Sequence, residues 1–217
     1  EDPPKEHSDD ERCSLGEGMF GETIRMKNSG DNGLYAVKKI KVAKAKAHGV
    51  TIDMMKKECA LLHKLSHPHI TRYFVSYFSK HGRYFNIVME LIEGGSLVEK
   101  VHATPAPSVD AITEWARQMA SALAYMHSEH ILHRDLKLDN ILLTSLSKIK
   151  IIDLGFACVA ATMAANATKV GAPLYASYEK TNGIPYDGRD DVWAVGCILL
   201  ELLTRSRLSD HGGGPIF

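Results

Sequence analysis

The sequence has little of what metal-stabilised, disulfide-stabilised or membrane-spanning proteins are built from. Its four cysteines, Cys13, Cys59, Cys158 and Cys197, lie far apart and form no C-x-x-C pair. Zinc sites and disulfide frameworks need closer, patterned spacing, so we expect reduced thiols. The longest apolar run, Val192–Leu200, is about half as long as a membrane span.

Charge of one sign is also lacking. Lys and Arg together number 26, as do Asp and Glu, so no surplus of positive charge points to nucleic acid or anionic lipid. The polar N-terminus is unlike a signal peptide. We therefore expect a cytoplasmic protein, with nuclear or cytoskeletal association also open, that binds neither nucleic acid nor a membrane.

The chain of 217 residues, 45% of them apolar, suits one domain or two small lobes that share a cleft. Residues 1–12 are charged and contain proline, so we expect a disordered tail. The chain begins without Met and stops in a Gly-rich stretch, and we expect it to be a fragment of a longer protein.

The first part of the chain is rich in strand-like segments. Alternating or β-branched runs separated by turn residues predict strands at Glu22–Lys27, Leu34–Val42, Tyr73–Phe78 and Arg83–Met89. Between them, an apolar stripe at helical spacing predicts a helix over Thr51–Leu65.

The second part is mainly helical. Ser108 is a plausible N-cap for a long helix whose apolar stripe runs from Ile112 to Met126. Short strands are expected at Ile141–Leu143 and Ile149–Ile152, and a very apolar helix at Asp191–Leu203. The β-rich part meets the helical part near residue 94, and ligands favour such junctions.

A glycine motif lies in the first part. It consists of Gly16, Glu17, Gly18, Met19, Phe20 and Gly21 and fits the pattern G-x-G-x-x-G. In a chain with this length and glycine content, chance alone produces the pattern about 0.1 times. A second strand follows it rather than a helix, which disfavours a dinucleotide-binding fold. Glycines on a hairpin let the backbone close over phosphate groups, although an ordinary glycine turn is the competing interpretation.

Lys38 follows Ala36 and Val37 on a predicted strand, and Glu58 lies at the edge of the apolar stripe of the predicted helix. An inward-facing Lys needs an anion, and an ion pair with Glu58 would place its ammonium group on nucleotide phosphates. The alternative is that both are solvated surface charges, as most Lys and Glu residues are.

The most informative stretch is His133-Arg134-Asp135-Leu136-Lys137-Leu138-Asp139-Asn140, followed after a short strand by Asp153. Chance places these residue types at these positions on the order of once in a thousand chains. Phosphoryl transfer needs alignment and charge neutralisation more than covalent chemistry. Asp135 would orient a substrate hydroxyl and accept its proton, and Lys137 would offset charge on the γ-phosphate. Asn140 and Asp153 offer hard oxygen ligands to Mg²⁺.

In these motifs the sequence resembles the protein kinase superfamily over residues 15–210. The matching segments are Gly16–Gly21, Ala36–Lys38, Glu58, His133–Asn140, Asp153–Gly155, Ala176–Glu179 and Asp191–Gly196. The resemblance implies an α+β, two-lobed protein kinase fold that uses ATP and Mg²⁺. A small lobe with an antiparallel β-sheet and helix C would occupy residues 13–93, and a mainly helical, incomplete lobe residues 94–217.

The resemblance also implies roles around the adenine, for Leu15, Thr23, Ala36, Met89, Glu90, Ile92 and Leu142. Met89 is similar to the gatekeeper, and the backbone of Glu90 and Ile92 to the adenine-binding hinge. Leu15, Ala36 and Leu142 would sandwich the base.

Lys137, two residues after Asp135, resembles the serine/threonine branch, and the stretches Val88–Leu97 and Val170–Tyr175 are most similar to the NIMA-related (NEK) kinases. Thr168 then corresponds to the usual activating phosphosite, with Thr162 as a weaker candidate. The implied partners are a protein substrate with a Ser or Thr acceptor and an upstream activating kinase, unless the chain phosphorylates itself.

Four residues depart from the family pattern: Thr23 replaces Val, Leu154 replaces Phe, Tyr178 replaces Pro and Ala172 replaces Thr. A Thr at position 172 would bond the catalytic Asp and Lys, so its loss could loosen Asp135. The helices that normally follow the last predicted one are also missing. Two alternatives to an active kinase therefore stay open, a nucleotide-binding pseudokinase scaffold and an inactive fragment of an active kinase.

Overall fold

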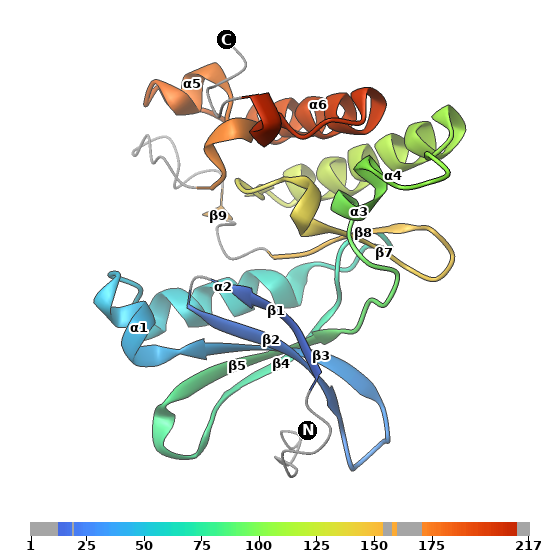
Figure 1. Cartoon of the computed structure of the whole chain (residues 1–217). Coiled ribbons are helices and arrows are strands. Elements are labelled where there is room, and N and C mark those ends of the chain that lie inside the picture. Colours follow the sequence, from blue (N-terminus) through green and yellow to red (C-terminus); the bar gives the residue numbers. More distant parts are fainter. Residues whose placement is uncertain (1–12, 19, 154–157, 160–170, 212–217) are drawn as a thin grey trace. The chain divides into compact units, whose positions relative to one another are not determined.

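The computed structural model describes residues 13–18, 20–153, 158–159 and 171–211, without the side chains at positions 58, 80, 158, 159 and 211. The chain forms two compact units, one of Glu1–Ser66 and Thr71–Ile92 and the other of His67–Ile70 and Glu93–Phe217 (Figure 1). Strands dominate the first unit and helices the second. The predicted α+β architecture, with a β-rich first part and a helical second part, is confirmed.

A five-stranded antiparallel sheet forms most of the first unit. Its strands are β1 (Cys13–Gly18), β2 (Gly21–Lys27), β3 (Leu34–Lys41), β4 (Tyr73–Phe78) and β5 (Tyr84–Glu90). Their order across the sheet is β1-β2-β3-β5-β4, so hairpins join β1 to β2, β2 to β3 and β4 to β5. The last hairpin includes a short 3₁₀ turn, η2 (Lys80–Gly82).

Strand β3 ends one residue before the predicted end, because Val42 begins a short helix, α1 (Val42–Ala47), which the sequence analysis did not predict. Val42 and Ala45 are buried, and the Val42 N–H donates to the carbonyl of Arg83 at 3.0 Å. Burial of two small apolar residues therefore fixes a helix too short to show a clear period in the sequence.

Helix α2 (Ile52–Lys64) matches the predicted helix, whose end residues Thr51 and Leu65 are its caps. The Thr51 hydroxyl accepts a hydrogen bond from the Met54 N–H at 3.1 Å, which satisfies one of the free donors of the first turn. Met55 and other residues of the predicted stripe are buried, and the helix packs against β4. The apolar stripe is thus what attaches this helix to the sheet.

The second unit holds the remaining elements: α3 (Val98–Val101), α4 (Val109–Ser128), β6 (Ile131–Leu132), η3 (Leu138–Asn140), β7 (Ile141–Leu143), β8 (Ile149–Ile151), β9 (Cys158–Val159), η5 (Pro173–Tyr175), α5 (Tyr178–Thr181), α6 (Arg189–Thr204) and η6 (Leu208–His211). Strand β6 pairs with β9, and β7 pairs with β8, both in antiparallel fashion.

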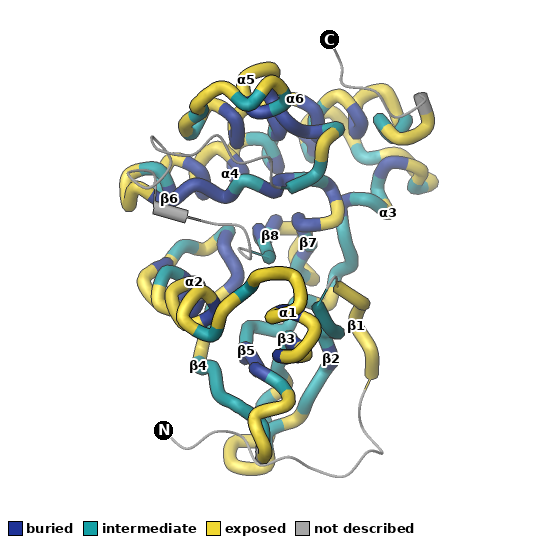
Figure 2. Tube along the Cα trace, turned by 90° about the vertical axis from the view of Figure 1, so that its left-hand side faces the viewer, coloured by how far each residue is buried: buried dark blue, intermediate teal, exposed yellow. Residues whose placement is uncertain are grey.

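Helices α4 and α6 pack against each other and supply much of the core of this unit. Ser108 caps α4 as predicted, because its hydroxyl accepts from the Ala111 N–H at 3.1 Å. Buried positions recur along both helices (Figure 2). Helix α6 is apolar on more than its buried side, since Val192 and Leu203 are exposed.

The segment His67–Ile70 belongs to the second unit although it lies between two elements of the first. The Ile151 N–H donates to the carbonyl of His69 at 2.8 Å, and Ile70 forms a parallel bridge with Ile151. The segment therefore extends the β7–β8 pair.

None of the helices in the described part of the chain is long and apolar enough to cross a membrane.

Gly21 provides a test of the close packing of β2 against β3. A Cβ atom on Gly21 would collide with the backbone carbonyl of Lys39, whereas one on Gly16 would meet nothing within 4 Å. We expect Gly21→Ala to lower the free energy of unfolding by about 1–3 kcal/mol, because the backbone must shift to accept it. Chemical denaturation measures the loss, with Gly16→Ala as the control. Equal stability of the two variants would contradict this packing.

Candidate active site

The loop His133–Lys137 joins β6 to the 3₁₀ turn that contains Asn140. His133, Asp135 and Asn140 are buried: 0%, 5% and 6% of the surface of these residues is exposed. Polar groups at such burial need hydrogen-bond partners, because leaving one unpaired costs about 1–3 kcal/mol. The partners of this loop therefore show how it is held.

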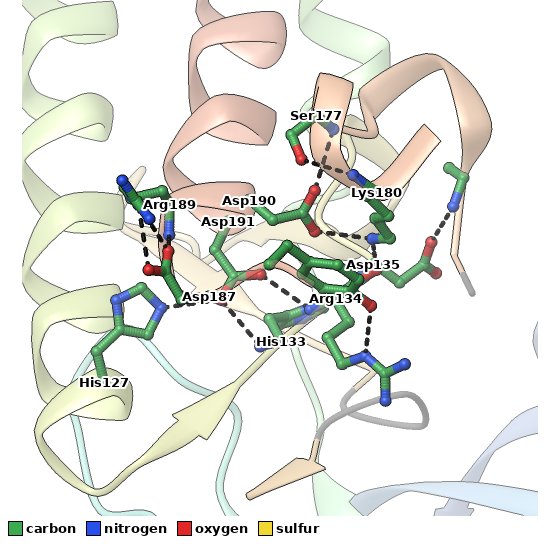
Figure 3. A network of polar contacts seen from close by, with 12 residues as sticks. His127, His133, Arg134, Asp135, Ser177, Lys180, Asp187, Arg189, Asp190 and Asp191 are labelled. Carbon is green, nitrogen blue, oxygen red and sulfur yellow. Dashed lines mark hydrogen bonds and ion pairs between the residues drawn. The ribbon is translucent and has the colours of Figure 1, made fainter. Parts of the chain in front are cut away.

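Asp191, in the first turn of α6, holds the backbone of the loop. Its carboxylate accepts from the N–H groups of His133 at 3.0 Å and Arg134 at 2.9 Å, and from Nε2 of His127 at 2.9 Å (Figure 3). Arg134 adopts the left-handed region, with φ of 71°, which a non-glycine residue keeps only when its surroundings fix it. A buried carboxylate thus stabilises a strained turn directly before Asp135.

The charge of Asp191 is itself stabilised. Burial tends to raise its pKa, but the hydrogen bond from His127, the nearby His133 and the two backbone N–H groups outweigh burial. The result is a pKa below the ordinary value of 3.8. The carboxylate is therefore ionised at neutral pH and accepts all three bonds at once.

His133 orients the same loop from inside. Its Nε2 lies 3.1 Å from the carbonyl of Ile152, which can only accept, so Nε2 is the donor. Nδ1 is then free to accept from the Asp135 N–H at 3.3 Å. The complete burial of His133 places it in the core.

Three donors hold the Asp135 carboxylate. Oδ1 accepts from the backbone N–H of Ala172 at 2.8 Å. Oδ2 accepts from Nδ2 of Asn140 at 3.1 Å and lies 3.3 Å from Nζ of Lys137. The sequence suggested that Ala172 would leave Asp135 loosely held, but its backbone amide provides a bond that needs no side chain. Gly171 allows this approach, because a Cβ there would collide with the carbonyl of Arg134.

Asn140 and Asp153 lie at one end of the β7–β8 pair. The Ile152 N–H donates to the carbonyl of Asn140 at 2.9 Å, so Asp153 comes one residue beyond the position opposite Asn140. Nδ2 of Asn140 is engaged by Asp135, which leaves its Oδ1 as the side-chain atom suited to a cation. A carbonyl oxygen and a carboxylate are the donors that Mg²⁺ takes. The donor set fits this metal.

Lys180 and Asp190 complete the network and were not among the expected site residues (Figure 3). Nζ of Lys180 lies 2.8 Å from Oδ2 of Asp190 and donates to the carbonyl of Arg134 at 2.7 Å. The pair Asp190-Asp191 at the start of an apolar helix is a sequence signal for buried ion pairs or hydrogen bonds, because charged side chains are almost never fully buried without a partner. Nothing in the sequence marks Lys180 as buried.

In the first unit, strand register gathers several of the residues expected at the nucleotide. Gly16 lies opposite Thr23, and Thr23 lies opposite Lys38. Ala36 lies opposite Met89 and two residues before Lys38 on β3. Directly paired residues and residues two apart share one face of a sheet. These five positions are thus on the same face, and Lys39 is on the other.

The glycines of the expected phosphate loop differ in what explains them. Gly21 is needed by the fold, as shown above. Added Cβ atoms at Gly16 and Gly18 would approach no described atom closer than 3.7 Å. Within the described residues, packing does not account for these two glycines, which agrees with the expected close approach of a phosphate.

Several expected residues have limited or no description. Met19 and Thr168 lie outside the described residues, as do Thr162 and Leu154. Glu58 is placed on α2 without its side chain, so its pairing with Lys38 stays a prediction.

The other adenine-site residues are spread over the two units. Leu15 is exposed on β1, and Glu90 ends β5, where its N–H donates to the carbonyl of Arg72 at 2.9 Å. Ile92 follows in the first unit, and Leu142 lies half-buried on β7 of the second. Their roles at the base remain predictions.

Comparison with known proteins agrees with this geometry. A family model described as protein kinase domain matches residues 10–214. The chain belongs to the protein kinase family. Among its relatives, this kinase chain is 37% identical over 193 residues to mouse serine/threonine-protein kinase Nek4 and 34% identical over 201 residues to mouse Nek1. Human Nek5 is 35% identical over 195 residues.

These matches cover 88% of the kinase chain for Nek4, 91% for Nek1 and 88% for Nek5, and they confirm the resemblance to the NEK group. The chain spans 24% of the length of Nek4, 16% of Nek1 and 27% of Nek5.

Replacing Asp191 by Asn tests the buried carboxylate. We expect Asp191→Asn to lower the free energy of unfolding at pH 7 by about 2–4 kcal/mol, because an amide cannot replace three charge-assisted acceptor contacts. A lowered pKa in the folded state adds stability above the ordinary value of 3.8, and this stability is lost as pH falls through the folded value. The difference from the parent should therefore narrow in acid.

Urea denaturation from pH 7 to pH 3 measures this difference. The control is Asp187→Asn, which removes an exposed pair with Arg189 and should cost little. A constant difference at all pH values, or equal losses in the two variants, would argue against the role given to Asp191.

Proposed function

We propose that this kinase chain transfers the γ-phosphoryl group of Mg·ATP to a Ser or Thr hydroxyl of a protein. The observation that carries the proposal is the Asp135 carboxylate, buried and fixed by Ala172, Asn140 and Lys137. A carboxylate held by several donors at an otherwise buried loop is positioned for a task rather than for stability. The names of the Nek relatives support serine/threonine specificity.

In this reaction the substrate oxygen attacks the γ-phosphorus, the bond between that phosphorus and the β–γ bridging oxygen breaks, and ADP leaves. Asp135 orients the attacking hydroxyl and receives its proton. Lys137, within 3.3 Å of Asp135, offsets the charge that develops on the transferred group. Both residues are on one short loop, so their spacing is set locally.

We further propose that the one-face set of the sheet, Gly16, Thr23, Ala36, Lys38 and Met89, receives the nucleotide. Lys38 would bind the phosphates with Glu58 as its ion-pair partner, and Gly18 would let the backbone approach them. Glu90 and Ile92 would bind the adenine edge through their backbone, and Leu15 and Leu142 would cover its faces.

Asn140 and Asp153 would hold Mg²⁺, which when bound neutralises phosphate charge and orients the triphosphate. The support is the side-chain oxygen that Asn140 can offer and the placement of Asp153 just beyond the residue paired with it. Thr168 would be the activating phosphosite, modified by an upstream kinase or by the chain itself.

A scaffold that binds nucleotide without transfer is less well supported. Ala172 was its main motivation, and the Ala172 N–H still donates to Asp135. Tyr178 is exposed at the start of α5, where Ser177 caps the helix, so its replacement of Pro leaves this turn formed.

Removal of the proton acceptor tests the reaction. We expect Asp135→Asn to reduce phosphate incorporation into casein or myelin basic protein by about 100-fold or more, because an amide cannot accept the hydroxyl proton. The assay uses the full-length protein and radiolabelled ATP. Equal incorporation by parent and variant would defeat the proposed function.

Two neighbouring lysines on β3 provide a matched test of nucleotide binding. We expect Lys38→Met to reduce transfer by about 100-fold, because the phosphates lose a fixed positive charge. Lys39 lies on the opposite face, 3.9 Å from Glu22 and above the ring of Tyr84. Lys39→Met should therefore keep nearly parental activity.

Initial rates with both variants at saturating and limiting ATP separate weaker binding from slower transfer. Similar losses in the two variants would exclude the one-face arrangement of the nucleotide site.

A further inference from the structure

Lys180 is a buried charge that the proposed reaction does not use. It lies on α5, a single turn, yet only 5% of its surface is exposed. Its ammonium group has two close partners, Oδ2 of Asp190 at 2.8 Å and the carbonyl oxygen of Arg134 at 2.7 Å. The ring of Tyr186 lies 5.4 Å from it.

Stability alone is a weak reason for burying this group. Removing a lysine and a carboxylate from water costs as much as their attraction returns, and apolar pairs of similar volume often serve a fold equally well. A buried ion pair instead fixes geometry when its hydrogen bonds reach backbone groups whose position matters. The second partner of Lys180 is such a group.

The carbonyl of Arg134 belongs to the peptide bond that leads into Asp135. At the other side of the same residue, the Arg134 N–H donates to Oδ1 of Asp191 at 2.9 Å. The backbone of Arg134 is thus held by an acceptor at its nitrogen and a donor at its oxygen, in the left-handed conformation described above. A charged donor at this carbonyl therefore restrains the peptide bond whose rotation would turn Asp135.

Lys180 also links the two segments that contact Asp135. Asp190, its ion-pair partner, accepts from the Ser177 N–H at 3.0 Å, and Ser177 caps the helix that carries Lys180. The chain that precedes this cap contains Ala172, whose N–H donates to Asp135. The network therefore fixes the loop of Asp135 and the segment that holds its carboxylate relative to each other (Figure 3).

We propose that Lys180 is a positioning residue for phosphoryl transfer, which acts through the Arg134 carbonyl to set the orientation of Asp135. This inference rests on the proposed function, because it assigns Lys180 a part in the step that Asp135 performs. It requires no contact between Lys180 and a substrate.

The test compares the double variant Lys180→Met/Asp190→Asn with Asp190→Asn alone, in the full-length protein. The double variant leaves no unpaired buried charge, and the oxygen of the introduced amide can still accept from the Ser177 N–H. The single variant keeps the donor to the Arg134 carbonyl. The two proteins therefore differ only in Lys180.

We expect the rate of the first turnover, measured by rapid quench with a protein substrate, to fall about 10- to 100-fold in the double variant relative to the single one. The KM values for ATP and protein substrate and the fraction of molecules that bind an ATP analogue should match the control. The melting temperature is measured separately, because the control keeps the Lys180 ammonium buried without its carboxylate partner. A lysine that only stabilises the fold would instead lower the active fraction and the rate together.

A first-turnover rate equal to that of Asp190→Asn, or a loss explained by the active fraction, would overturn the proposal. If the double variant does not fold, Lys180→Arg replaces it, because the longer planar group keeps the charge but cannot occupy the same position beside Arg134. We then expect at least about a threefold lower rate with unchanged KM values, and a parental rate would count against Lys180.

Asp135→Asn in the same experiment separates the two levels of inference. Parental turnover by Asp135→Asn would remove the proposed role of Asp135 whatever Lys180 does. If the first-turnover rate falls in Asp135→Asn but the rate of the double variant equals that of Asp190→Asn, only the role of Lys180 is contradicted.

Discussion

The loop of the candidate active site depends on one buried carboxylate. Asp191 binds the backbone N–H groups of two successive residues, His133 and Arg134, and thereby fixes a turn that the backbone would not adopt by itself. Buried backbone donors must be satisfied, and a charged acceptor satisfies them more strongly than a neutral one. The strain at Arg134 is thus offset where it arises, one residue before Asp135.

The position of this carboxylate on a helix contributes to its effect. Asp190 and Asp191 occupy the first turn of α6, where unpaired N–H groups favour negative charge. Both carboxylates are almost fully buried, and each has specific partners: backbone N–H groups and His127 for Asp191, Lys180 and Ser177 for Asp190. Because α6 packs against α4, the two carboxylates and the loop that Asp191 binds are attached to the core of the second unit.

At position 172, where Ala stands in place of the Thr of the family pattern, a backbone group binds Asp135. The Ala172 N–H reaches the Asp135 carboxylate because Gly171, with φ of 89°, brings the chain close to the carbonyl of Arg134. A residue with a side chain would be excluded there by both conformation and space. The functional contact therefore depends on the glycine as much as on the residue that donates.

Local signals in the sequence were enough to predict a β-rich first part, a helical second part, most of the elements and the His133–Asn140 loop as the candidate site. Strands β4 and β7 have the bounds expected from their residue pattern, and helix α4 begins directly after its expected cap, Ser108, because these signals are local. The spacing of Asp135, Lys137 and Asn140 is local as well, and the three side chains do meet. Helix α1 escaped prediction because six residues give too little period to detect.

The distant groups that complete the site became visible only in the folded chain. Lys180 lies 46 residues from Arg134 along the chain, and Asp191 lies 58 residues from His133. Nothing in the sequence marks Lys180 as buried, and the Asp190-Asp191 pair indicates only that its charges need partners. Which groups become the partners is set by the elements that later pack around them. The sequence therefore determined which groups suit the proposed chemistry, because their types and spacing are local. Only the tertiary structure decided which distant charges hold these groups in place, because those contacts join segments far apart in the chain.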